Sequence, residues 1–325
     1  ACTSRATVDF YRAIHLHGAP ASRPQRQPMS MMEQTVQCPD GTRLHASLHT
    51  PDNTPTDTPV IVIAGALGVP MRFYSRFAEF LADRGYRVMT FNYRGTGKAA
   101  GPMPSELLRL ENWGRQDLDS MLGSALALAG GQPVYLIGHS IGAQLLGLAP
   151  RSRALHGAVF VGASFAYWRR WPSPQRVKYW TLFKLLIPLL TRLSPTFPAR
   201  AVGLGSENLP SSLMRDWATW VNHPDYLLSP AAGLDAAQAY RTLSLQVLSL
   251  QFADDAYVPP AAAQKLYSSY PALHFELRHK ADLPAPVGHF GFFREVSGAP
   301  YWPEVLAWLH AQHPVSTGEQ HAQGR

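Results

Sequence analysis

The chain has 325 residues, of which 46% are hydrophobic and 16% are charged, so it can bury a sizeable core and is not a disordered protein. Its two cysteines, Cys2 and Cys38, are too few for a disulfide framework or a four-ligand zinc site. The sequence contains no run of about 18 uncharged apolar residues, as a transmembrane helix requires, and no signal-peptide pattern. From these absences we expect a cytoplasmic protein.

The formal net charge of +7 is unevenly distributed. Residues 1–30 carry a net +3, residues 165–200 carry seven basic and no acidic residues, and the remainder is mildly acidic. The basic internal segment is mixed with Trp, Leu, Ile and Phe, and no zinc-finger or RNA-recognition motif is present, so we expect no nucleic-acid partner. Two interpretations stay open: a solvated helix face, or a surface that attracts anionic substrates or makes weak contact with a lipid membrane.

Hydrophobic patterns predict the following elements in chain order. Residues 1–28 show no apolar period and are interpreted as an extension that is disordered or non-native. Alternation on both sides of Asp40-Gly41 predicts a hairpin. Continuous apolar runs or helical spacing then predict strands at 59–64, 86–92, 133–137, 157–163, 244–252 and 273–278, and helices at 71–83, 112–129, 141–148 and 303–312.

Strands that alternate with helices at this interval predict an α/β fold, with a mostly parallel central sheet and helices on both faces. Residues 165–243 interrupt the pattern: they show no convincing strand and predict several helices, with Pro188 kinking one of them. We therefore expect a core formed by 29–164 and 244–313, a helical cap at 165–243, and a tail at 314–325.

The predicted strand at 133–137 leads directly into Gly138-His139-Ser140-Ile141-Gly142, a G-x-S-x-G pattern followed by a helix. In such a turn the serine has a strained backbone, and small residues on either side let the turn close. The hydroxyl then projects over the carboxyl edge of the sheet, at the positive end of the following helix. Ser140 is therefore predicted to be a nucleophile.

Three further motifs extend this pattern: AGALG at 64–68, NYRGTG at 92–97 and GHFGFF at 288–293. With them the chain resembles the α/β-hydrolase superfamily over about residues 33–313, and its details resemble a little-characterised group of predicted hydrolases near the monoacylglycerol-lipase-like branch. Two residues depart from the family pattern. Ala64 stands where many relatives carry His, and Asn92 stands in place of a common Asp, which alters the support of these turns.

The resemblance implies a triad in the chain order serine, acid, histidine. Asp255 begins a stretch that fits the family form D-x-x-V-P and is the predicted acid, with Asp254 as the alternative. His289 follows the last strand on a glycine-flanked loop and is the predicted general base. The backbone N–H groups of Ile141 and, by resemblance to the H-G-x turn, Ala66 are the predicted oxyanion donors.

The cap is rich in aromatic residues, and part of this apolar surface is expected to face Ser140. An apolar acyl or aromatic substrate is therefore favoured over a sugar or a peptide. The residues predicted to line the substrate pocket are Leu67, His139, Tyr167, Trp168, Trp171 and Phe290.

These features predict a serine hydrolase, similar to esterases and lipases, that cleaves carboxylic esters of apolar acyl or aromatic substrates through an acyl-enzyme on Ser140. Thioesterase, amidase or peptidase, lactonase, carbon–carbon hydrolase and acyltransferase activities use the same triad and stay open. A non-catalytic binding module is the alternative from another class. No cofactor or metal is expected, since no phosphate-binding glycine loop or metal-ligand spacing is present. The sequence gives no indication of the oligomeric state.

Overall fold

The computed structural model describes residues 29–51, 55, 57–99 and 103–313, so the predicted extension and tail lie outside the described residues. Its centre is an eight-stranded sheet with the order β1-β2-β4-β3-β5-β6-β9-β10. These strands are β1 Met29–Gln37, β2 Arg43–Pro51, β3 Val60–Ala64, β4 Arg87–Phe91, β5 Val134–His139, β6 Gly157–Val161, β9 Gln246–Phe252 and β10 His274–Lys280.

The sheet is mostly parallel, as the alternation of strands and helices predicted. Only β2 makes antiparallel pairs, with β1 on one side and β4 on the other. The β1–β2 hairpin turns at Asp40-Gly41, where Gly41 has a φ of +83° that a residue with a side chain rarely adopts. The remaining pairs from β4 to β10 are parallel, so their carboxyl ends meet at one edge.

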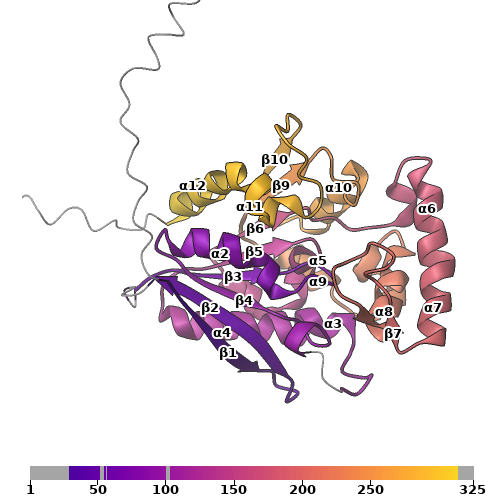
Figure 1. Ribbon diagram of the computed structural model, residues 1–325, viewed down its shortest axis with the longest axis horizontal. Coiled ribbons are helices and arrows are strands. Elements are labelled where there is room, and N and C mark those ends of the chain that lie inside the picture. Colours follow the sequence, from indigo (N-terminus) through magenta and orange to yellow (C-terminus); the bar gives the residue numbers. More distant parts are fainter. Residues whose placement is uncertain (1–28, 52–54, 56, 100–102, 314–325) are drawn as a thin grey trace, which may run out of the picture.

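Alternate residues of the central strands enter two separate cores. In β3, Val60 and Val62 belong to one core, whereas Ile61 and Ile63 belong to the other. The second core is completed by α2 and α12, and the first by α4 and α10 together with much of the cap, so helices cover both faces (Figure 1). The helices of this part are α2 Ser75–Ala82, α3 Leu110–Asn112, α4 Asp119–Ala129, α5 Ile141–Gln144, α10 Pro260–Ser269, α11 Glu295–Gly298 and α12 Trp302–Gln312.

Two predicted helices are less regular than expected. The helix predicted at 112–129 consists of α3, a π-helical stretch at Trp113–Leu118, and α4. The helix predicted from 141 is α5 followed by a 3₁₀ stretch at Leu145–Leu148. Hydrophobic spacing does not distinguish an α-helix from a helix with a short π or 3₁₀ stretch. The apolar face over three or four turns changes little when the hydrogen-bond register shifts by one residue.

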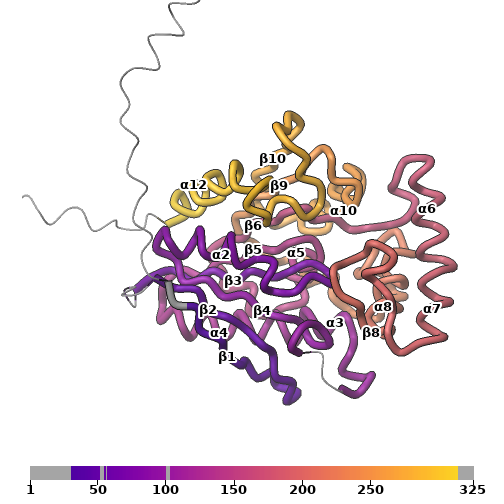
Figure 2. Tube along the Cα trace, in the orientation of Figure 1, coloured from indigo at the N-terminus to yellow at the C-terminus, as the bar shows by residue number. Residues whose placement is uncertain are grey.

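The cap segment, residues 165–243, contains α6 Gln175–Thr181, α7 Ile187–Leu193, α8 Ser211–Val221 and α9 Ala237–Thr242. A π-helical stretch at Leu182–Leu186 joins α6 to α7, so Pro188 lies in the first turn of α7. The segment also has two strands that the sequence did not predict, β7 Thr196–Phe197 and β8 Leu209–Pro210. They are two residues long, too short for a period-two pattern. Figure 2 shows α6 and α7 running along the outer edge of this end of the molecule.

Within the described ranges, the structure contains no helix that is both long enough and apolar enough to cross a membrane.

Candidate active site

Ser140 lies in a strained turn directly after β5. Its φ of 53° and ψ of −114° are outside the conformations that residues with side chains readily adopt. The glycines of the motif make this turn possible. A Cβ added at Gly138 would lie 2.6 Å from the backbone of Ala143, and one at Gly142 would lie 2.1 Å from the carbonyl oxygen of Ala64. The turn therefore packs backbone against backbone and leaves the serine at its apex, followed at once by α5.

Asp255 and His289 form a hydrogen-bonded pair after the ends of β9 and β10. Nδ1 of His289 lies 2.8 Å from Oδ2 of Asp255, and the two side chains are 7% and 1% exposed. The other carboxylate oxygen of Asp255 accepts the Tyr257 N–H at 2.8 Å, which fixes the carboxylate plane. Because Nδ1 faces the carboxylate, Nε2 is the ring nitrogen left for proton transfer.

Asp254, the alternative predicted acid, makes a different contact. Its carboxylate is on the surface side of the turn and accepts the backbone N–H of Val287 at 2.8 Å. It therefore ties the loop that carries His289 to the end of β9, and among the hydrogen bonds of the described residues none joins it to the imidazole.

Gly162 lies against the Asp255–His289 pair, and the sequence analysis did not single it out. It directly follows β6 and has a φ of +58°. A Cβ at this position would lie 3.2 Å from Oδ2 of Asp255 and 3.3 Å from Nδ1 of His289. The absence of a side chain therefore makes room for the acid–base pair. In the sequence, the feature that could have identified Gly162 is a glycine at the end of a buried strand, in GAVFVGA.

Ser140 and His289 line the same cavity. No direct hydrogen bond joins them among those formed by the described residues. Catalytic hydrogen bonds of this kind are often long in the absence of substrate and shorten when it binds. The cavity thus holds the predicted nucleophile and the predicted base, with the acid behind the base.

The two predicted oxyanion donors are placed differently. Ile141 is the first residue of α5, and both Ile141 and Ala66 line the cavity. The backbone N–H of Ala66, however, donates a 2.7 Å hydrogen bond to the phenol oxygen of Tyr74. For Ala66 to serve a substrate, this hydrogen bond has to be shared or released, whereas the amide of Ile141 has no such competitor among the described residues.

Tyr74 also takes part in a series of buried hydrogen bonds that links it to His139 and His289. Its oxygen lies 3.0 Å from Nδ1 of His139, and Nε2 of His139 lies 2.9 Å from the backbone carbonyl of His289. A carbonyl only accepts, so Nε2 carries the proton and donates to it. Burial lowers the pKa of His139 well below its usual value, which keeps the ring neutral and leaves Nδ1 as the acceptor for the Tyr74 hydroxyl.

The cavity has about 610 Å³ of empty space, including its open mouth. Of the residues predicted to line it, Leu67, Trp171 and Phe290 do so. Sequence reasoning did not assign the other lining side chains. They are mainly apolar and aromatic and come from both the core and the cap: Gln144, Ser164, Ala166, Tyr179, Phe183, Leu204, Trp217, Tyr257 and Val258.

Three residues predicted to line the pocket are not among its lining residues. His139, the last residue of β5, is fully buried. Its ring points away from the cavity and forms a hydrogen bond with Tyr74. Tyr167 and Trp168 pack edge to face against each other, and the guanidinium of Arg169 lies over the Trp168 ring. These two rings therefore pack against each other and against a cap arginine, and neither lines the cavity.

Hydrogen bonds connect the cap segment to the acid-bearing turn. Nε1 of Trp171 donates to the carbonyl of Ala256 at 3.0 Å, and the hydroxyl of Tyr179 donates to the same carbonyl at 3.3 Å. In the opposite direction, the hydroxyl of Tyr257 donates to the carbonyl of Gly203 at 2.6 Å. The cap and the Asp255 turn therefore form one wall of the cavity.

Comparison with known proteins agrees with this architecture. The model of a family described as "Alpha/beta hydrolase family" matches residues 60–314. Among solved structures, a soluble variant of monoglyceride lipase from Saccharomyces cerevisiae is similar at 16% identity and a TM-score of 0.58, over 90% of this chain and 97% of that chain. Among curated proteins, the search finds no match.

Two further solved structures are similar to the chain. An esterase of Pyrococcus furiosus has 15% identity and a TM-score of 0.57, over 90% of this chain and 96% of that chain. A thermophilic esterase from Thermogutta terrifontis has 16% identity and a TM-score of 0.53, over 87% of this chain and 99% of that chain. At these identities the likeness concerns the fold.

Proposed function

Because the chain belongs to the alpha/beta hydrolase family, we propose that it is a serine hydrolase that cleaves carboxylic esters through an acyl-enzyme on Ser140. The observation that carries the proposal is the convergence of three chain segments on one cavity. The strained serine after β5 and the imidazole of His289 line it, and Asp255 holds that imidazole at 2.8 Å. The esterase and lipase structures that resemble the chain support the choice of ester chemistry.

In the proposed reaction, Nε2 of His289 removes the proton of the Ser140 hydroxyl as the oxygen attacks the acyl carbonyl. The imidazolium that forms is stabilised by Asp255 and then protonates the leaving alcohol. Water repeats the sequence on the acyl-enzyme and releases the acid. The amide of Ile141 stabilises the negative charge that develops on the carbonyl oxygen, a contribution of about 3 kcal/mol for one such donor.

The lining supports an apolar acyl or aromatic substrate. Trp171, Tyr179, Phe183, Trp217 and Phe290 surround the cavity, and few polar side chains face it. Burial of an acyl chain against such walls contributes about 0.8 kcal/mol per methylene. We therefore expect kcat/KM for p-nitrophenyl esters to rise as the acyl chain lengthens beyond acetyl. A preference for acetyl over every longer chain would contradict a large apolar acyl pocket.

The test of the reaction class is a panel of matched ester, thioester and amide substrates, run with the wild type and with Ser140→Ala. Ester hydrolysis should exceed amide hydrolysis, and Ser140→Ala should lose several orders of magnitude in kcat while its circular dichroism is unchanged. If thioesters or amides are preferred, one of the alternative acyl-transfer activities replaces the ester assignment.

A non-catalytic binding module is the alternative from another class. It predicts no turnover of any substrate of the panel and no covalent reaction with a fluorophosphonate. The Asp255–His289 hydrogen bond and the strained Ser140 argue against it, because a module that only binds a ligand has no need of a strained nucleophile. The cytoplasmic location expected from the sequence stays a prediction.

A further inference from the structure

The outer edge of the cap segment carries an unusual concentration of exposed apolar side chains. Nine large hydrophobic residues are exposed in the described part of the chain, and five of them lie on the continuous helical stretch from α6 to α7, residues 175–193. Leu185, Leu189 and Leu193 are 52%, 55% and 74% exposed. We call this the outer cap face, defined by Val177, Trp180, Leu185, Leu189 and Leu193.

Basic residues border the outer cap face. Arg176, Lys178, Lys184 and Arg192 are all exposed on the same helical stretch, and residues 165–200 contain no acidic residue. Among the described residues none of these four forms an ion pair. Arg176 donates to the backbone carbonyl of Trp171, and the ammonium of Lys178 lies near the ring of Tyr179. Their charges are therefore not neutralised by the protein itself.

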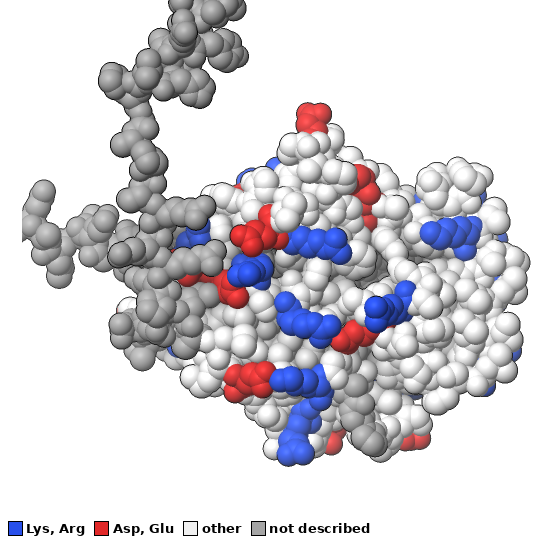
Figure 3. Space-filling view, in the orientation of Figure 1, with Lys and Arg blue, Asp and Glu red and all other residues white. Residues whose placement is uncertain are grey.

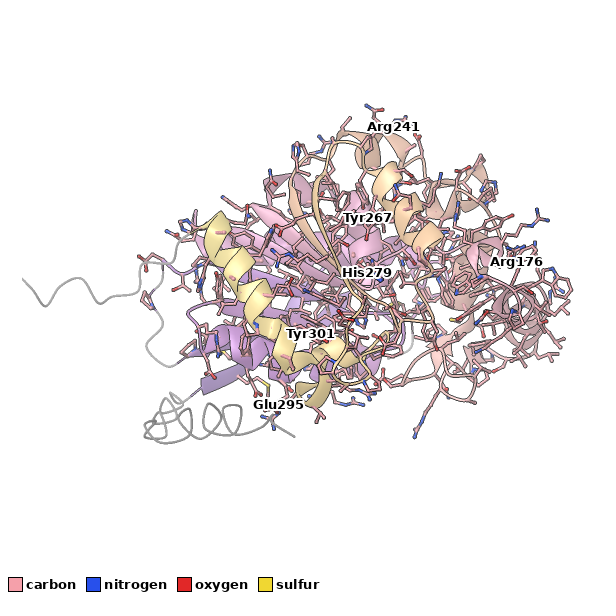
Figure 4. The ribbon with its side chains drawn as sticks, turned by 90° about the horizontal axis from the view of Figure 1, so that it is seen from above. Arg176, Arg241, Tyr267, His279, Glu295 and Tyr301 are labelled. Atoms are coloured by element: carbon pink, nitrogen blue, oxygen red, sulfur yellow. The ribbon has the colours of Figure 1, made fainter. Side chains whose placement is uncertain are left out.

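The figures place this surface at one end of the molecule. Figure 4 shows Arg176 at the cap end, well separated from His279 and Tyr301 on the sheet side. In Figure 3 the charged atoms visible over α6 and α7 are blue, surrounded by uncharged surface. The opposite side of the same stretch is buried, and there Tyr179 and Phe183 line the cavity. One helical stretch thus presents one face to the cavity and the other to the surroundings.

We infer that the outer cap face binds to an anionic lipid bilayer. A helix that combines Trp and Leu on one face with flanking Lys and Arg has the composition that places helices in the interface of a membrane. The apolar side chains would enter the acyl boundary, and the four basic side chains would pair with anionic headgroups. The docking does not depend on the catalytic role proposed above, because none of the residues of the outer cap face lines the cavity.

A second copy of the chain fits this surface less well. In a two-fold symmetric contact the same patch is present on both sides, so the basic patch that contains Lys178, Lys184 and Arg192 would meet the equally basic patch of the second copy. No acidic side chain of residues 165–200 is present to neutralise them. Like charges brought together at the rim of a dry interface oppose association, whereas a negatively charged bilayer attracts the same residues.

Sedimentation with vesicles tests the inference. We expect Ser140→Ala protein, which keeps hydrolysis out of the measurement, to bind vesicles of phosphatidylcholine and phosphatidylglycerol more tightly than vesicles of phosphatidylcholine alone. The difference should diminish at high salt. Equal binding to both vesicle types at every salt concentration, or binding to neither, would overturn the inference.

Two sets of variants assign the binding to the outer cap face. Leu185→Gln with Leu189→Gln should lower the partition coefficient at least tenfold, whereas the control Leu277→Gln with Val296→Gln, exposed residues outside the cap, should leave it unchanged. Lys178→Gln with Lys184→Gln should lower it roughly 30-fold. Its control removes two exposed charges elsewhere, Arg43→Gln with Arg153→Gln, and should have a much smaller effect.

In an otherwise wild-type background, all four double variants should hydrolyse a water-soluble short-chain p-nitrophenyl ester at the same rate, which separates a docking defect from a damaged site. If the controls reduce vesicle binding as much as the cap variants, the outer cap face is not the docking surface. Analytical ultracentrifugation adds a further check. A dimer that dissociates on Leu185→Gln with Leu189→Gln would assign the face to self-association and overturn the lipid inference.

Discussion

The phenol oxygen of Tyr74 lies 3.0 Å from Nδ1 of His139, and both side chains are fully buried. This hydrogen bond joins the turn after β3 to the nucleophile turn, because the same phenol oxygen accepts the Ala66 N–H and His139 immediately precedes Ser140. On the other side of the ring, Nε2 of His139 donates a hydrogen bond to the backbone carbonyl of His289. Three segments of the site are thus held by one buried tyrosine.

Replacing Tyr74 by Phe tests this arrangement. The variant keeps the ring but leaves Nδ1 of His139 and the N–H of Ala66 without their partner. We expect the free energy of unfolding to fall by about 1–3 kcal/mol, as for other buried groups left unpaired. We also expect kcat to fall by about tenfold with little change in KM, because Ser140 and His289 lose part of their positioning. Urea denaturation and ester kinetics measure the two effects.

An unchanged or higher kcat in Tyr74→Phe would contradict this role. It would mean that the phenol competes with the substrate for the Ala66 amide, and that its removal frees an oxyanion donor.

The two adjacent aspartates provide a matched pair of variants. Asp255→Asn replaces the carboxylate that faces Nδ1 of His289, which disturbs the imidazole tautomer, and should lower kcat by about 10⁴-fold. Asp254→Asn keeps an oxygen that can accept the Val287 N–H and should stay within a fewfold of the wild type. Steady-state kinetics on one ester decide between them. A larger loss in Asp254→Asn would reverse the assignment of the acid.

Much of the fold followed from local patterns. The strands after 59 and 86 are continuous apolar runs because both faces of the sheet are covered, and the structure places them at Val60–Ala64 and Arg87–Phe91. The G-x-S-x-G turn requires glycine at Gly138 and Gly142 for a steric reason, because a Cβ at either position would clash with neighbouring backbone atoms. Such features depend on residues that are close together in the chain, so they can be predicted from one sequence.

Other parts of the site depend on contacts between distant segments. Tyr74 has the appearance of an ordinary apolar position at the start of a helix, yet its hydroxyl connects residues 66 and 139. His139 was expected to line the pocket, but successive residues at the end of a strand point to opposite sides, and its side chain is buried on the side away from the cavity. The lining by Tyr179 and Phe183 depends on how the cap packs, which helical spacing alone does not determine.

Gly162→Ala should disturb the acid–base pair. The new methyl group would press on Asp255 and His289, and the φ of +58° adds about 1–2 kcal/mol of backbone strain. The matched control is Gly130→Ala, which has the same φ but no atom within 4 Å of its Cβ. Both variants should lose stability in thermal unfolding, whereas only Gly162→Ala should lose kcat, by tenfold or more. Equal kcat in the two variants would remove Gly162 from the site.

His139 predicts a pH dependence of stability. Burial lowers its pKa in the folded state, whereas in the unfolded chain the pKa is about 6.5. The unfolded state therefore binds an additional proton below pH 6.5, and stability present above that pH is lost as the pH falls. His49, whose pKa burial also lowers, contributes in the same direction. The expected slope is at most about 1.4 kcal/mol per pH unit for each histidine.

In His139→Gln the slope of the free energy of unfolding against pH should decrease by up to about 1.4 kcal/mol per pH unit. This change in slope does not depend on how stable the variant is at pH 7. Urea denaturation of both proteins at several pH values between 5 and 7 gives the two slopes. Identical slopes would show that His139 does not stay neutral in the folded protein.

The central claim is that Ser140 is a nucleophile activated by His289. It is tested most directly by incubating the protein with a fluorophosphonate and measuring the intact mass. We predict one covalent adduct per chain that peptide mapping places on Ser140, no adduct in Ser140→Ala, and a labelling rate at least 100-fold slower in His289→Ala. A wild-type protein that stays unlabelled, or an adduct that persists in Ser140→Ala, would contradict the account.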